Sequence, residues 1–175
     1  CRLDGPAGRL ACQDKEVSLA PVVPIRVFGP TFTEWSEGHP ECTKRGQPFS
    51  GRRCAKQTSE DYRRMASDLY NLAPQLVRSS YLDRDLRAPL PEACEQDTRQ
   101  GTLRPASTHR GSIARTYLYM AYTYPAHASL SPQMINVLER WNLEDPPSPQ
   151  ECGRGAAIAA LQGNRNRFLE QGCGR

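Results

Sequence analysis

Arginine is the residue type in this chain that is best suited to bind phosphate. Only three of its 23 cationic residues are lysines, and its net charge is +4. A guanidinium group makes planar, two-pronged contacts to phosphate or carboxylate that an ammonium group cannot make. The candidate phosphate-binding residues are Arg52, Arg53, Arg110, Arg115, Arg165 and Arg167. The pattern predicts a basic face that binds nucleic acid, and codon choice in a GC-rich genome is the alternative explanation.

Two of these arginines also have a structural interpretation. Arg110 and Arg115 flank the predicted start of a helix, where phosphate binds readily. The alternative is an ion pair with Asp68 or Glu151. Four nearby tyrosines could stack on bases, but they fall on mixed helical faces. We therefore expect Tyr117 in the core and the others on an amphipathic surface; the four are Tyr117, Tyr119, Tyr122 and Tyr124.

Seven cysteines indicate disulfides and an oxidising compartment. They are Cys1, Cys12, Cys42, Cys54, Cys94, Cys152 and Cys173. No Cys-x-x-Cys pair is present and no histidine has zinc-ligand spacing, so no zinc site is expected. The prediction is a periplasmic or secreted protein, in which the odd number leaves one thiol free or paired with another chain. A chain that begins with cysteine suggests a mature product without its leader, or a lipidated N-terminus.

The composition indicates one globular domain over residues 1–175. Apolar residues make up 38% and charged residues 24% of the chain, which excludes a disordered protein. The length is sufficient for a hydrophobic core. No run of 18 apolar residues exists, so no membrane span is expected.

The pattern of apolar residues predicts a mostly helical α+β domain with minor strands near the N-terminus. Short strands are expected at residues 22–23 and 25–28. Residues 36–54 are expected to form a loop that is closed by a Cys42–Cys54 disulfide. Ser59 should cap a helix that ends at Ala73-Pro74.

The second half of the chain is predicted to be helical after a turn-rich stretch. Residues 83–110 are expected to form an ordered loop or a weak hairpin. Helices are predicted over residues 111–124, from Ser131-Pro132 to Asp145, and from about 149 to 169. Gly155 and Gly163 could divide the last one, whose inward residues would include Cys152 and Leu161.

Three segments together resemble the bacterial endonuclease I family, which are exported nucleases with a ββα-metal (His-Me) finger. Residues 110–117, Arg-Gly-Ser-Ile-Ala-Arg-Thr-Tyr, are similar to the family's Arg-Gly-x-Ile-Ala-Arg-Thr-Tyr helix. Residues 68–74 resemble Asp-x-His-Asn-Leu-x-Pro, and residues 162–168 resemble Gln-Gly-Asn-x-Asn-x-Phe. The resemblance covers roughly residues 20–173 and implies an endonuclease I-like fold with a remnant finger.

The resemblance also implies metal-assisted phosphodiester hydrolysis, for which the residues are largely missing here. A histidine acts as general base, and a glutamate and an asparagine hold a divalent ion. The glutamate and histidine positions fall on Ala20 and Pro21, and the asparagine on Asn71. The position of the family's helix histidine is occupied here by Tyr70. A lone amide does not hold Mg²⁺, so no catalytic or metal site is expected to be intact.

The resemblance implies a set of disulfides as well. Its cysteine positions suggest the pairs Cys1–Cys173, Cys94–Cys152 and Cys42–Cys54, with Cys12 left unpaired. The alternative is Cys1–Cys12 with Cys173 free, because pairing cannot be deduced from spacing.

The resulting hypothesis is an exported pseudonuclease without a cofactor, which binds nucleic acid or a protein partner instead of hydrolysing DNA. One alternative is an active Mg²⁺-dependent DNA or RNA endonuclease whose base is relocated to His39, with Glu34 or Glu37 near the old metal position. Another is a purely protein-binding effector or assembly module. All three histidines, His39, His109 and His127, are expected in solvated loops.

Overall fold

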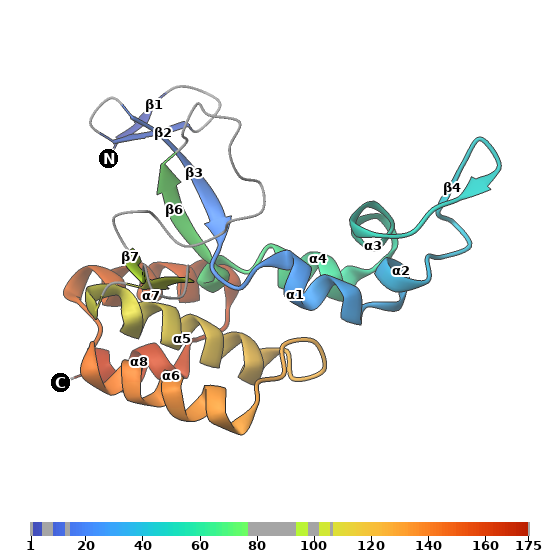
Figure 1. Cartoon of the computed structure of the whole chain (residues 1–175). Coiled ribbons are helices and arrows are strands. Elements are labelled where there is room, and N and C mark those ends of the chain that lie inside the picture. Colours follow the sequence, from blue (N-terminus) through green and yellow to red (C-terminus); the bar gives the residue numbers. More distant parts are fainter. Residues whose placement is uncertain are drawn as a thin grey trace.

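The computed structural model describes residues 2–4, 9–12, 15–76, 94–97, 102–105 and 107–174. Within these ranges the chain forms a small antiparallel sheet, an arm of short helices and a helical body (Figure 1).

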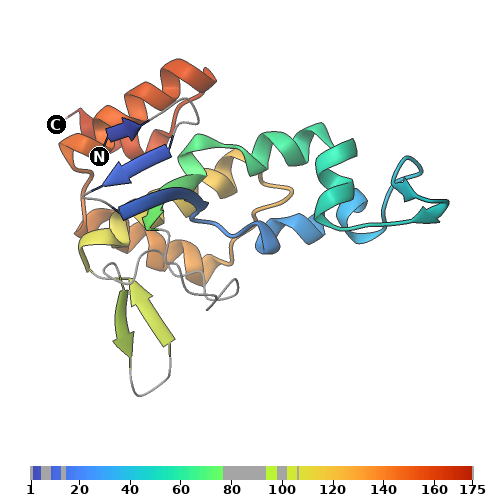
Figure 2. The ribbon, with the colours of Figure 1, turned by 90° about the horizontal axis from the view of Figure 1, so that it is seen from above.

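The sheet holds the segment that carries Ala20 and Pro21. Its strands, in spatial order, are β1 (Arg2–Asp4), β2 (Arg9–Cys12), β3 (Lys15–Pro21) and β6 (Leu72–Leu76), all antiparallel (Figure 2). The predicted strands at 22–23 and 25–28 are wrong. The chain leaves β3 at Pro21, and Pro24 then occupies the N-cap position of helix α1 (Ile25–Phe28) in an extended conformation that suits proline.

The arm follows β3 and returns to the sheet. Its elements are α1, η1 (Gly29–Thr31), α2 (Thr33–Ser36), the hairpin β4 (Thr43–Lys44) and β5 (Gln47–Pro48), α3 (Arg52–Thr58) and α4 (Glu60–Ala66). The Cys42–Cys54 disulfide is confirmed and closes this hairpin against α3. The predicted loop at 36–54 is therefore partly regular structure.

Helix α4 begins as predicted but ends early. The Ser59 hydroxyl accepts a hydrogen bond from the Tyr62 amide, which confirms the predicted cap. The helix was expected to continue to Leu72, but it stops at Ala66. Asp68 then caps the 3₁₀ turn η2 (Leu69–Asn71), and Leu72 enters β6.

The body contains α5 (Ser107–Thr123), α6 (Pro132–Glu144), α7 (Pro149–Gln162) and α8 (Arg167–Cys173). The Ser131 cap and the end of α6 before Asp145 are confirmed. Gly163 divides the last predicted helix because it adopts φ +77°, which glycine tolerates best. In the predicted turn-rich stretch, β7 (Cys94–Asp97) pairs with β8 (Thr102–Pro105) as a hairpin.

Cys152 pairs with Cys173, so the predicted pairs Cys94–Cys152 and Cys1–Cys173 are wrong, as is a free Cys173. The turn at Gly163 folds α8 back along α7 and brings the two Cα atoms to 5.6 Å. Cys1 lies outside the described residues, as do the side chains of Cys12 and Cys94.

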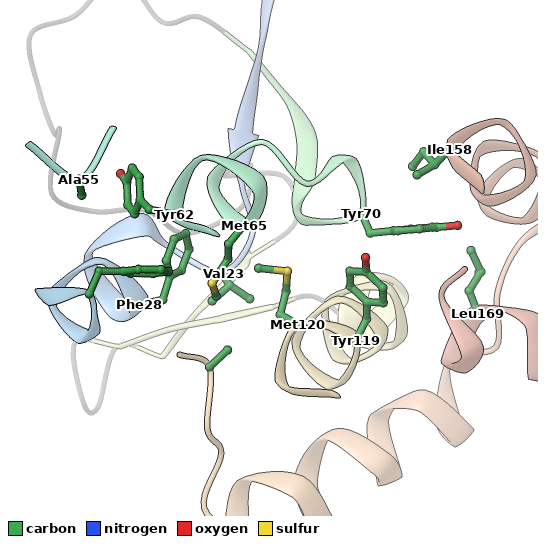
Figure 3. Packing of buried hydrophobic residues seen from close by; sticks show 12 residues of the cluster. Val23, Phe28, Ala55, Tyr62, Met65, Tyr70, Tyr119, Met120, Ile158 and Leu169 are labelled. Carbon is green, nitrogen blue, oxygen red and sulfur yellow. The ribbon is translucent and has the colours of Figure 1, made fainter. Parts of the chain in front are cut away.

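One buried cluster runs from the arm into the body (Figure 3). Phe28 and Tyr62 lie at its arm end, and Met65 meets Met120 of α5 in the middle. Tyr119 is also buried there, which corrects the prediction that placed it on the surface. Leu161 was expected to point inward but is exposed. The arm and the body therefore share one core.

Candidate functional site

Ala20 and Pro21 lie at the end of β3, opposite Ala73 and Leu72 of β6. Both are partly buried. Neither side chain has an atom that can coordinate a cation or accept a proton. The pairing with β6 places Asn71 next to this strand end, where its carbonyl accepts a hydrogen bond from the Val22 amide.

The Asn71 amide is bonded to the backbone on both sides. Its Oδ1 accepts a hydrogen bond from the Val23 amide at 2.7 Å, and its Nδ2 donates to the Val23 carbonyl at 3.1 Å. The Asn71 carbonyl also accepts from the Val22 amide. The side chain is only 1% exposed. These hydrogen bonds connect η2 to the segment that follows β3. Asn71 therefore has a structural role that requires no metal.

The residues at this position do not fit Mg²⁺. The ion prefers carboxylate oxygens in octahedral geometry, whereas Ala20, Pro21 and Asn71 supply a methyl group, a pyrrolidine ring and an amide that is already hydrogen-bonded. Across the described ranges, no group of three or more histidine, cysteine, aspartate or glutamate side chains is placed to hold a metal ion.

The residues proposed for a relocated site lie in the arm. Glu34 is in α2, and Glu37 and His39 follow it. The Nδ1 atom of His39 accepts a hydrogen bond from the Glu41 amide of its own loop at 3.3 Å. Asn71, by contrast, belongs to η2 beside the sheet. Glu34, Glu37 and His39 therefore belong to a different part of the chain from Asn71.

Only part of the histidine prediction holds. His109 is exposed as predicted, but it lies in the first turn of α5 and not in a loop. His127 is partly buried, which corrects its assignment to a solvated loop: its ring stacks on Phe32 at 3.7 Å, and its Nδ1 lies 2.8 Å from the Thr31 hydroxyl. His127 thus helps to fasten the end of α5 to the arm.

The carboxylate of Asp68 is the centre of a buried hydrogen-bond network that the sequence did not predict. Its buried carboxylate accepts hydrogen bonds from the hydroxyls of Tyr119 and Tyr124 at 2.7 Å each. The Tyr70 amide and Gln162 Nε2 donate to the other oxygen. This carboxylate borders a cavity of about 690 Å³, but its acceptor positions are filled by the protein. The Asp-x-x-Asn spacing of residues 68–71 was the available signal.

The tyrosines around Asp68 predict alkaline unfolding. Burial, followed by the hydrogen bond to Asp68 and its charge, raises the pKa values of Tyr119 and Tyr124 well above their usual range. Both phenols stay protonated in the folded state, so above pH ~10 only the unfolded state releases these protons. The free energy of unfolding should be unaffected by them below that pH and should fall above it.

Phenolate absorbance and circular dichroism, followed together from pH 8 upward, would check this expectation. Part of the phenolate signal should appear only as the helical signal is lost. Tyr124→Phe should reduce the pH dependence and cost about 1 kcal/mol at neutral pH. Complete phenolate formation in a protein that stays folded would contradict the expectation.

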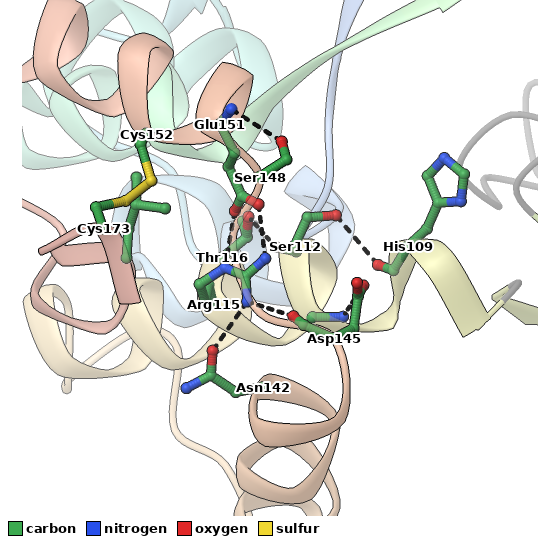
Figure 4. Close-up of polar contacts among 12 residues, drawn as sticks. His109, Ser112, Arg115, Thr116, Asn142, Asp145, Ser148, Glu151, Cys152 and Cys173 are labelled. Atoms are coloured by element: carbon green, nitrogen blue, oxygen red, sulfur yellow. Dashed lines mark hydrogen bonds and ion pairs between the residues drawn. A yellow bond between two sulfur atoms is a disulfide. The ribbon is translucent and has the colours of Figure 1, made fainter. Parts of the chain in front are cut away.

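Arg115 is buried inside the body and does not belong to an outer basic face (Figure 4). Its side chain is 2% exposed. Nε and Nη2 donate to the two Glu151 oxygens at 2.8 and 2.6 Å, and Nη1 donates to Asn142 and to the Asp145 carbonyl. The Glu151 ion pair considered as the alternative is thus formed, and the assignment of Arg115 as a phosphate ligand is corrected.

The other predicted arginines belong to two regions of the chain, the arm and the helical body, whose ribbons Figure 1 shows. Arg52 and Arg53 are exposed in α3 of the arm. Three lie in the body: Arg110 over Trp141, Arg165 paired with Glu170 at 2.6 Å, and Arg167 over the exposed Tyr122 ring at 4.8 Å. The arm and the body thus each present arginines.

The Endonuclease I family model matches residues 86–173, just over half of the chain. The chain belongs to the endonuclease I family. It is 29% identical over 177 residues to an extracellular deoxyribonuclease of Aeromonas hydrophila, covering 95% of this chain and 70% of the relative. It is 31% identical over 163 residues to a periplasmic deoxyribonuclease of the same species, covering 87% and 62%. It is also 31% identical over 151 residues to Endonuclease-1 of Buchnera aphidicola subsp. Acyrthosiphon pisum, covering 79% and 57%.

The chain therefore spans between 57% and 70% of the length of these relatives. The predicted endonuclease I-like, mostly helical α+β fold is confirmed. The protein is periplasmic or secreted, as its cysteines predict: the two Aeromonas relatives are extracellular and periplasmic, and two disulfides are formed. Among the described helices, none has the length and hydropathy needed to cross a bilayer.

Proposed function

We propose that this protein is an exported, non-catalytic member of the endonuclease I family that binds nucleic acid, acting as a single domain over residues 1–175. The observation that carries the proposal is the strand end at Ala20 and Pro21, beside an Asn71 amide that is bonded to Val23. In this proposal, β3, β6 and the adjoining turns are the remnant of the family's metal finger.

The expected effect on catalysis is large. A missing general base costs about 10²–10⁴-fold in rate, and the absence of a metal removes several kcal/mol of transition-state stabilisation. Pro21 also lacks a backbone donor and has a fixed φ, so a neighbouring side chain could take over only if the strand were rebuilt.

Nucleic acid is the ligand that the remaining features favour. The Aeromonas relatives are deoxyribonucleases by name. This chain has a net charge of +4, and Arg52, Arg53 and Arg167 are exposed. Exposed arginines can contact phosphate without any of the residues that hydrolysis requires.

A plasmid-nicking assay tests the proposal. With Mg²⁺ or Mn²⁺ we expect no nicking above background, under conditions in which an active extracellular deoxyribonuclease converts all the plasmid. A filter-binding titration at two salt concentrations should show retention of the same DNA, weaker at the higher concentration.

Nicking that co-purifies with the protein and is abolished by EDTA would overturn the non-catalytic part of the proposal. His39→Ala then identifies the source, because loss of that activity would place the base in the arm. Absence of DNA retention at low salt would overturn the binding part.

A further inference from the structure

One short segment of the arm carries the whole net charge of the protein. Residues 41–58 contain a single carboxylate, Glu41, and five cationic residues, a net charge of +4 that equals that of the 175-residue chain. The cations are Lys44, Arg45, Arg52, Arg53 and Lys56, and all of them are exposed. The rest of the chain is neutral overall, so attraction to a polyanion is concentrated here.

Residues 41–58 are termed the basic finger. Their conformation is stabilised by contacts within the arm and does not depend on a ligand. The buried Cys42–Cys54 disulfide joins the base of the β4–β5 hairpin to α3. The Phe49 amide donates to the Cys42 carbonyl, and the Gly51 amide donates to the Trp35 carbonyl, at 2.8 Å each. The hairpin projects at the far end of the arm, away from the body (Figure 1). Binding therefore requires little ordering of the backbone.

Several cationic residues of the basic finger occupy positions at which the local backbone conformation favours other residue types. Arg45 has φ +52° and Gly46 has φ +76° in a two-residue hairpin turn, for which Asn-Gly is strongly preferred over Arg-Gly. Arg52 and Arg53 occupy the first turn of α3, where the helix dipole favours carboxylates. Unfavourable local choices of this kind point to side chains kept for a function.

We infer that the basic finger contacts the phosphate backbone of duplex DNA, with Lys44 and Arg45 at its tip. The inference rests on the proposed function and adds where the nucleic acid is held. From Thr43 to Pro48 every residue is exposed and none is a large apolar residue. Protein-binding centres instead favour buried aromatic anchors and are poor in lysine. Glu41, the one carboxylate, lies at the base and not at the tip of the hairpin.

Arg45→Asn separates binding from folding. Asparagine suits the left-handed conformation better than arginine, so the thermal midpoint should stay constant or rise. Affinity for a duplex of about 20 base pairs should nevertheless fall about threefold to tenfold at low salt, equally for different sequences. The slope of log K against log salt should become shallower by ~0.9, and by twice that for Lys44→Gln with Arg45→Asn.

Arg140→Gln is the control, because it removes one exposed positive charge from α6 in the body. It should leave the affinity within twofold of the wild type. An equal loss in both variants would show that net charge alone matters and would overturn the inference.

The remaining outcomes separate the two proposals. If the wild type binds duplex DNA and Arg45→Asn binds as tightly, the finger assignment fails while the proposed function stands. If the wild type binds no nucleic acid at low salt, both fail, and retention on vesicles of anionic lipid instead would show that the finger serves a membrane surface.

Discussion

Arg115→Leu is expected to lower the free energy of unfolding by about 3–5 kcal/mol, because it leaves a largely buried carboxylate without its partner. The Glu151 side chain is 21% exposed, and both of its oxygens are bound by the Arg115 guanidinium. The Asp145 carbonyl and the Asn142 amide lose a donor at the same time. Urea denaturation followed by circular dichroism would measure the loss.

Two further variants separate the loss of the charge from the loss of the two-pronged contact and control for the removal of an arginine. Arg115→Lys keeps the charge but cannot reproduce the two-pronged contact, so it should recover only part of the lost stability. Arg140→Ala removes an exposed arginine from α6 and should cost less than about 1 kcal/mol. If Arg115→Leu were as stable as the wild type but no longer bound DNA, Arg115 would be a phosphate contact after all.

Asn71→Asp should cost about 2–4 kcal/mol at neutral pH, and added Mg²⁺ should not restore the loss. The aspartate loses the donor to the Val23 carbonyl and places a negative charge beside that oxygen. If Asn71 were a metal ligand, the extra carboxylate would instead strengthen ion binding, and Mg²⁺ would stabilise the variant by mass action.

The pH dependence of this variant has a definite sign. Burial next to a carbonyl oxygen raises the pKa of the introduced carboxyl above its unfolded value. The variant should therefore be closest to the wild type below pH ~4, where the neutral carboxyl can donate to Val23, and should lose stability as the pH rises. Asn136→Asp, on an exposed position of α6, is the control and should show little change. A Mg²⁺-dependent rise in the unfolding midpoint of Asn71→Asp would contradict the structural role.

Local signals predicted the helical body well. Ser131-Pro132 fixed the start of α6, and Gly163 fixed the division between α7 and α8, because caps and left-handed positions depend on a few adjacent residues. The end of α4 was missed for the opposite reason. The helical spacing continues through Leu69 and Leu72, but Asp68 and the pairing of β6 with β3 impose a different structure.

Contacts between segments that are distant along the chain could not be predicted from the sequence. The bond between Asn71 and Val23 spans 48 residues, and the bond between Tyr119 and Asp68 spans 51. The Cys152–Cys173 pair depends on how α8 folds back, which spacing does not reveal. The absence of metal-binding side chains at Ala20 and Pro21 is visible in the sequence itself, and the resemblance alone implies that a metal-binding pair is expected there. The partner of the Asn71 amide, the Val23 backbone, could not be deduced from the sequence because it lies 48 residues away along the chain.

The two described disulfides each join cysteines that are close along the chain, with separations of 12 and 21 residues. Closing such short rings costs less chain entropy than joining distant segments. An exported polypeptide emerges from the translocation machinery from one end to the other. Each ring can therefore oxidise as soon as its second thiol has crossed, and the Cys42–Cys54 ring can close while the helices of the body are still on the other side.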